Sequence, residues 1–98
     1  MRGVGPTLSD FGVEGVLARP VLSLLRGGEV IALNEGWTTA PNASEIRGVS
    51  ALLGAFALGD DSTDSALFIT LTSGVYTVHV AGANETTGVA LAEIYEAP

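Results

Sequence analysis

The sequence predicts an all-β fold, an antiparallel β-sandwich with one short helical segment. Apolar and polar residues alternate in the last third of the chain, as side chains do on the two faces of a strand. The 13 glycines separate apolar runs and do not form one tract, which is typical of a β protein with tight turns. A length of 98 residues fits one small domain with one core, so residues 1–98 are expected to form a single unit.

A β-hairpin is the first element expected. Residues 21–25 form an apolar run, and Pro20 stands at its start, where a strand tolerates a missing N–H. Gly27 and Gly28 then form a two-residue sequence that suits a type I′ or II′ turn. Residues 29–34 are expected to return as the second strand.

A short helix is expected after the hairpin. Apolar residues recur there at the three- and four-residue spacing of one helical face: Ile46, Val49, Leu53 and Phe56. Asn42 and Glu45 stand three residues apart, as in a capping box at a helix start. We expect this segment to cover one end of a sheet.

The last third predicts three more strands. Residues 66–71 and 75–81 alternate on either side of a turn at 72–74, and a polar loop at 82–88 leads to residues 89–95. The side chains expected in the core are Leu22, Leu24, Leu67, Ile69, Tyr76, Val78, Val80 and Leu91.

The charge balance excludes several classes of partner. The chain has four arginines, no lysine and a formal net charge of −7. A nucleic-acid binder needs a clustered basic face, so neither nucleic acid nor an anionic membrane surface is expected as a partner. No apolar run reaches the roughly 20 residues that span a bilayer. Without cysteine, disulfides and thiolate metal sites are excluded.

An acidic cluster is the one candidate metal site. Asp60, Asp61 and Asp64 supply carboxylate oxygens of the kind that calcium binds, although their spacing does not match an EF-hand loop. The alternative is a solvated loop in which Asp64 bonds local backbone N–H groups. No other cofactor is expected.

Two further side chains have a functional and a structural interpretation. Trp37 is the candidate carbohydrate-binding residue, because a flat aromatic ring can stack on a sugar. The alternative interpretation is that Trp37 lies in the core. His79 is the only histidine, but it lies within an expected strand and no G-x-S-x-G motif accompanies Ser65 or Ser73. The sequence therefore does not predict an enzyme.

Several stretches resemble a known family. They are RGVGPTL, FGVEGVLARPVLSL, IALNEGW, DDSTDSALFITLTSGVYTVHVAG and TTGVALAEIYE. In this order they resemble the immunoglobulin-like, peptidase-C-terminal-like β-sandwich module that is repeated in large secreted bacterial proteins. The resemblance implies an immunoglobulin-like or jelly-roll-like sandwich, a secreted or cell-surface location and a non-catalytic role. This chain would be one module of a larger secreted protein or an assembling subunit.

The resemblance also shows two departures. The family has a proline before the glycine of the turn where this chain has Thr72-Ser73-Gly74. The family's first strand also runs several residues ahead of RGVGP, so either the chain is cut short or another chain completes the edge.

These departures give the expected function. Arg2, Val4 and Leu8 are the candidate assembly edge, and we expect a structural, assembly or adhesion module that associates with itself or with neighbouring domains. The alternative is a carbohydrate- or calcium-binding accessory domain of a secreted enzyme.

Overall fold

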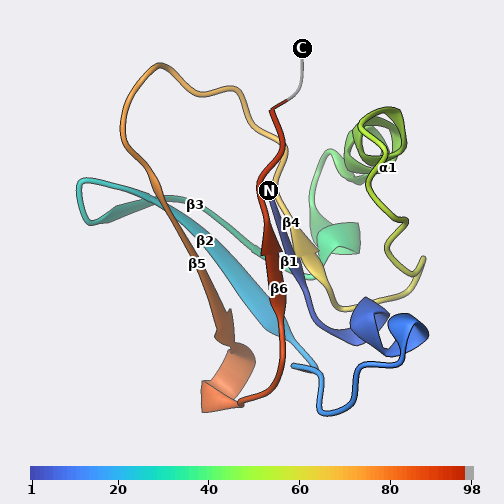
Figure 1. Ribbon diagram of the computed structural model, residues 1–98. Helices are drawn as coiled ribbons and strands as arrows, with labels where there is room; N and C mark the ends of the chain where they lie inside the picture. Colours follow the sequence, from blue (N-terminus) through green and yellow to red (C-terminus); the bar gives the residue numbers. More distant parts are fainter. Residues whose placement is uncertain (97–98) are drawn as a thin grey trace.

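The computed structural model describes residues 1–96 and contains two three-stranded antiparallel sheets and one α-helix (Figure 1). One sheet has the order β4-β1-β6 and the other has the order β3-β2-β5. The strands are β1 (Arg2–Val4), β2 (Pro20–Arg26), β3 (Glu29–Glu35), β4 (Ser65–Ala66), β5 (Thr77–Gly82) and β6 (Leu91–Glu93). The helix is α1 (Ala43–Leu52), and the 3-10 turns are η1 (Pro6–Phe11), η2 (Trp37–Thr39) and η3 (Ala83–Glu85). The predicted β-rich class with one short helix is confirmed.

The predicted hairpin is confirmed as β2 and β3. Gly27 and Gly28 both have positive φ angles, 59° and 81°, which a type I′ turn requires and which glycine adopts at no steric cost. Leu22 and Leu24 of β2 are fully buried, because this strand is the centre of its sheet.

The predicted helix is confirmed, but its cap is not. Asn42 precedes α1 without forming a side-chain cap, and its Nδ2 instead donates to the carbonyl of Phe68 at 3.0 Å. Phe56 lies beyond the end of α1 and packs edge-on against Phe11, with ring centroids 4.8 Å apart. The capping box is therefore wrong, because the asparagine is used to tie the helix to the chain after β4.

The last third of the chain differs from the prediction. β4 and β5 lie in different sheets, so residues 67–76 cross from one sheet to the other and do not form a hairpin (Figure 1). Ile69 and Leu91 were expected in the core, but they are about two-fifths exposed. The strands predicted over residues 75–81 and 89–95 are present in part as β5 and β6, whereas the one predicted over residues 66–71 ends at Ala66.

The candidate assembly edge is not an edge. β1 lies between β4 and β6, with Arg2 opposite both Ala66 and Glu93, and Leu8 is buried in η1. The prediction for Arg2 and Val4 is wrong because β6 comes from the far end of the chain, and local sequence does not reveal that pairing.

The two faces of the sheet that contains β1 are covered differently. Val4 joins a core cluster that includes Trp37 and Ile46 on the side of α1. On the other side Gly3 faces the second sheet, and a Cβ built on it would lie 3.4 Å from both methyl groups of Val80. Among residues 1–96, no helix has both the length and the apolarity needed to cross a bilayer.

The helix offers a local test of stability. Gly48 lies inside α1, and a Cβ there would meet no atom within 4 Å. Gly48→Ala is expected to raise the free energy of unfolding by about 0.5–1 kcal/mol, because alanine loses less backbone entropy in a helix. Urea denaturation followed by circular dichroism measures this. The matched control is Gly54→Ala, which has equal space but a φ of 75° and should be destabilising. A loss of stability in Gly48→Ala would contradict the helix.

Candidate functional site

An apolar groove opens beyond Met1, at the start of β1. Its volume is about 490 Å³, and it lies between residues 67–71 on one side and residues 94–96 on the other. Leu24, Tyr76 and Val78 of the second sheet and its preceding segment line it as well. The groove thus lies between the two sheets, where residues 67–76 arch from one to the other (Figure 1).

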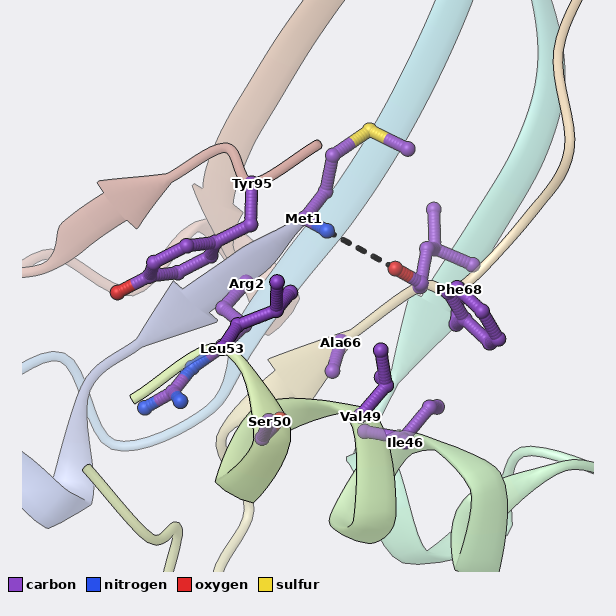
Figure 2. Close-up of a pocket in the computed structure, with 10 residues that line it drawn as sticks. Met1, Arg2, Ile46, Val49, Ser50, Leu53, Ala66, Phe68 and Tyr95 are labelled. Carbon is purple, nitrogen blue, oxygen red and sulfur yellow. Dashed lines mark hydrogen bonds between the residues drawn. The ribbon is translucent and has the colours of Figure 1, made fainter. Parts of the chain in front are cut away.

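The hydrogen-bond ladder of the sheet continues up to this groove. The amino group of Met1 donates to the carbonyl of Leu67 at 2.9 Å, the bond drawn in Figure 2, and the N–H of Leu67 donates to the carbonyl of Met1 at 2.9 Å. Within residues 1–96, the backbone of residues 69–71 pairs with no strand. The ladder therefore leads directly to residues 69–71, whose backbone groups pair with no strand in the described part of the chain.

A second, smaller cavity lies on the face of β1 that is turned toward α1. Its volume is about 40 Å³, and Val49 of α1 and Leu53, the residue that follows the helix, form one wall of it. In Figure 2, Met1 lies between Tyr95 and Phe68, which also line this cavity. The continuation of β1 beyond Met1 therefore has an apolar space on each face.

Arg2 fixes β6 beside β1. Its side chain is 3% exposed, and its Nη1 donates to the carbonyl of Phe56 at 2.7 Å while the guanidinium lies 4.5 Å from the centre of that ring. Its Nε lies 3.1 Å from Oε1 of Glu93 as an ion pair, without the alignment of a hydrogen bond. This buried pair orients the chain that forms one wall of the groove.

Two titratable groups at the groove have shifted pKa values. Burial, and then the positive charge of Arg2, lower the pKa of the Met1 amino group below its usual 8.0. The hydrogen bond from the Tyr95 hydroxyl to Glu93, 2.8 Å long, is the main cause that raises the pKa of Tyr95 above its usual 10.0. Glu93 therefore links Arg2 of β1 to Tyr95 at the groove.

The link to Tyr95 gives a prediction about pH. Because the folded pKa of Tyr95 is raised, the contribution of this hydrogen bond is complete below pH 10.0 and is lost as pH rises through the folded pKa. In a Tyr76→Phe background, an absorbance titration should show Tyr95 ionising above pH 10.0. Adding Glu93→Gln should move that titration to lower pH. If the two titrations coincide, Glu93 does not accept this bond in solution.

The candidate calcium ligands are not brought together. Asp64 is fully buried and accepts bonds from the N–H groups of Gly5, at 2.7 Å, and Thr7, at 3.2 Å, and from the Thr7 hydroxyl. Asp60 is exposed and pairs with Arg47 at 2.5 Å, and Asp61 is exposed. In the part of the chain that the structure describes, no three metal-ligating side chains gather. Asp64 instead ties β1 and η1 to the start of β4.

The side chain of Trp37, the candidate carbohydrate-binding residue, is buried. Trp37 is 2% exposed, and its Nε1 donates to the Gly59 carbonyl at 3.2 Å and to Ser62 Oγ at 3.3 Å. The guanidinium of Arg47 lies 5.1 Å from its ring centre. Trp37 therefore occupies the core and presents no free ring face on which a sugar could stack.

The candidate catalytic residues are separate. His79 is exposed on β5, opposite Ser23 of β2. Ser65 is buried and its hydroxyl donates to the carbonyl of Pro20, whereas Ser73 lies in the exposed crossing segment. The structure thus brings neither serine to the histidine.

Sequence reasoning missed the groove itself. It placed residues 66–71 in a hairpin, which would have satisfied the backbone groups that are free here. The one signal that pointed to this region was the resemblance, which implies a longer first strand. Comparison with protein-family models, with curated proteins and with solved structures found no match to this chain.

Proposed function

We propose that this chain is a non-catalytic structural module, an immunoglobulin-like β-sandwich that is secreted or displayed at the cell surface. It assembles by accepting an extended strand of another polypeptide in the groove beyond Met1. The observation that supports this proposal most directly is the ladder that continues through Met1 and Leu67 into an apolar groove with no strand in it, within residues 1–96.

The physical case for a strand, as opposed to a small molecule, rests on the backbone. A strand in line with β1 would pair its N–H and C=O groups with Ile69 and Leu71, the alternate residues that follow the hydrogen-bonded pair of Met1 and Leu67. Strand addition of this kind obtains its affinity from main-chain hydrogen bonds and its specificity from pockets for side chains. Each large apolar side chain buried in the groove would contribute about 1.5–3 kcal/mol.

The test of this proposal is strand binding to the purified chain. A short acetylated and amidated peptide, with lysines at its N-terminal end and four apolar β-branched or leucine residues at its C-terminal end, is titrated against the protein. The expected result is a saturable 1:1 complex by light scattering and slowed hydrogen exchange at the amides of Ile69 and Leu71, since a paired strand protects alternate amides.

The control is a variant in which the same strand is fused ahead of Met1, so that the groove is filled within one chain. This variant should not bind the free peptide. If the peptide does not bind the original chain, or if it protects β3 at the sheet edge and leaves the amides of Ile69 and Leu71 unprotected, the proposal is overturned.

A further inference from the structure

We propose that a pocket between α1 and residues 55–58, the helix pocket, binds a small aromatic carboxylate whose ring lies among apolar side chains and whose carboxylate pairs with Arg47. The helix pocket has a volume of about 120 Å³, and its lining residues all lie between residues 37 and 58. It shares no lining residue with the groove beyond Met1, so this inference is independent of strand assembly.

The helix pocket exists because the chain turns back at the end of α1. Gly54 has a φ of 75°, and its N–H donates to the carbonyl of Ala51 at 3.2 Å. This left-handed turn ends the helix and brings residues 55–58 back beside it. Alanine methyl groups leave space between the helix and the returning chain that larger side chains would fill. The alanines that line the pocket are Ala51, Ala55 and Ala57.

The interior of the helix pocket suits one aromatic ring. Its buried lining side chains are Trp37, Ile46 and Leu58, and it opens to solvent at Ala51 and Ala57, which are exposed. An apolar cavity of about 150 Å³ binds benzene. A pocket of about 120 Å³ with an open mouth therefore holds one ring and excludes a larger ligand. The indole of Trp37 offers that ring an aromatic neighbour.

The rim of the helix pocket provides a cation for the carboxylate. The guanidinium of Arg47 lies 5.1 Å from the ring centre of Trp37 and lines the pocket. Its Nη1 donates to Asp60 at 2.5 Å, and among residues 1–96 Asp60 is the only protein acceptor of this guanidinium. The side chains of this pair are 60% and 76% exposed, so the pair is weak and a second carboxylate can join or replace Asp60. An arginine has five N–H donors and binds carboxylates in a bidentate manner.

The first experiment compares three ligands. Benzoate has both the ring and the charge, benzyl alcohol has the ring without the charge, and acetate has the charge without the ring. We expect benzoate to bind 1:1 with a dissociation constant of about 1 mM, benzyl alcohol about fivefold more weakly, and acetate more weakly still. Amide chemical shifts of residues 46–58 and the fluorescence of Trp37, the single tryptophan, report binding.

A protein variant that fills the helix pocket locates the ring. Ala51→Leu places a large side chain at the mouth and should abolish benzoate binding, while α1 remains formed because leucine is a good helix former. The matched control is Ser44→Leu, which puts the same side chain at an exposed position of α1 that does not line the pocket. It should bind benzoate as the original chain does. Circular dichroism verifies that both variants are folded.

Two charge variants locate the carboxylate. Arg47→Met keeps an unbranched side chain at the rim without its charge, and it should weaken benzoate to the level of benzyl alcohol. Asp60→Asn removes the competing carboxylate and should strengthen benzoate about twofold to threefold. Asp61→Asn is its control, because Asp61 is exposed and forms no ion pair with an arginine in the described part of the chain.

The outcomes decide each part of the inference. Absence of benzoate binding, or binding that Ala51→Leu leaves unchanged, overturns the site. Equal affinities for benzoate and benzyl alcohol, or unchanged benzoate affinity in Arg47→Met, overturn the carboxylate as the ligand class. Weaker binding in Ala51→Leu and Arg47→Met, with Ser44→Leu and Asp61→Asn close to the original chain, supports both parts.

Discussion

Asp64→Ala is expected to lower the free energy of unfolding by about 3–5 kcal/mol, a large part of the stability of a small domain. The substitution leaves the buried N–H groups of Gly5 and Thr7 without an acceptor, at about 1–3 kcal/mol each. It also frees the Thr7 hydroxyl, which itself accepts the N–H of Gly59 at 3.1 Å. Three chain segments therefore lose their common anchor at once.

The matched control is Asp61→Ala. It removes a carboxylate three residues away that is exposed, so its effect should stay within about 0.5 kcal/mol. Urea denaturation of both variants, followed by tryptophan fluorescence, measures the difference, because Trp37 lies against this anchor through its N–H bond to the Asp64 carbonyl. Equal stabilities of the two variants would show that the buried aspartate does not anchor the fold.

Local signals in the sequence predicted local structure correctly. Gly27 and Gly28 adopt the positive φ angles of the predicted turn. The helical spacing placed Ile46 on the buried face of α1. In each case the deciding interactions lie within a few residues of one another, so a single sequence contains them.

Non-local partners decided the rest. The acidic cluster suggested calcium or local backbone bonds for Asp64, but its partners Gly5 and Thr7 are 59 and 57 residues away in the chain. Likewise, β1 gains a second neighbour from Leu91–Glu93, which makes it a central strand. Neither pairing leaves a periodic signal, because it depends on which segments the fold brings together.

The groove combines both kinds of information. The alternation of residues 66–71 predicted a strand, but β4 ends at Ala66, and the topology shows that residues 69–71 have no strand partner among residues 1–96. In a sequence, such a site shows only as an alternating segment, and the alternation does not reveal whether another strand pairs with it.

Arg2→Ala is expected to lower the free energy of unfolding by about 3–5 kcal/mol, because it leaves Glu93, with 15% of its side chain exposed, without its cation. The Phe56 carbonyl also loses its donor, and the Phe56 ring loses the guanidinium stacked on it. Chemical denaturation again measures the loss.

The comparison that isolates burial is Arg19→Ala. Arg19 pairs with Glu35 at 3.3 Å, but both side chains are largely exposed, so this variant should lose no more than about 1 kcal/mol. A double variant, Arg2→Met with Glu93→Leu, should recover much of the loss of Arg2→Ala, since two apolar side chains need no ionic partner. If the double variant is as unstable as Arg2→Ala, the cost arises from the Phe56 contacts and not from the unpaired carboxylate. Glu93 also bonds Tyr95, which lines the groove. If the double variant recovers its stability, its affinity for a strand shows whether the groove requires the ion pair or only a well-packed β6.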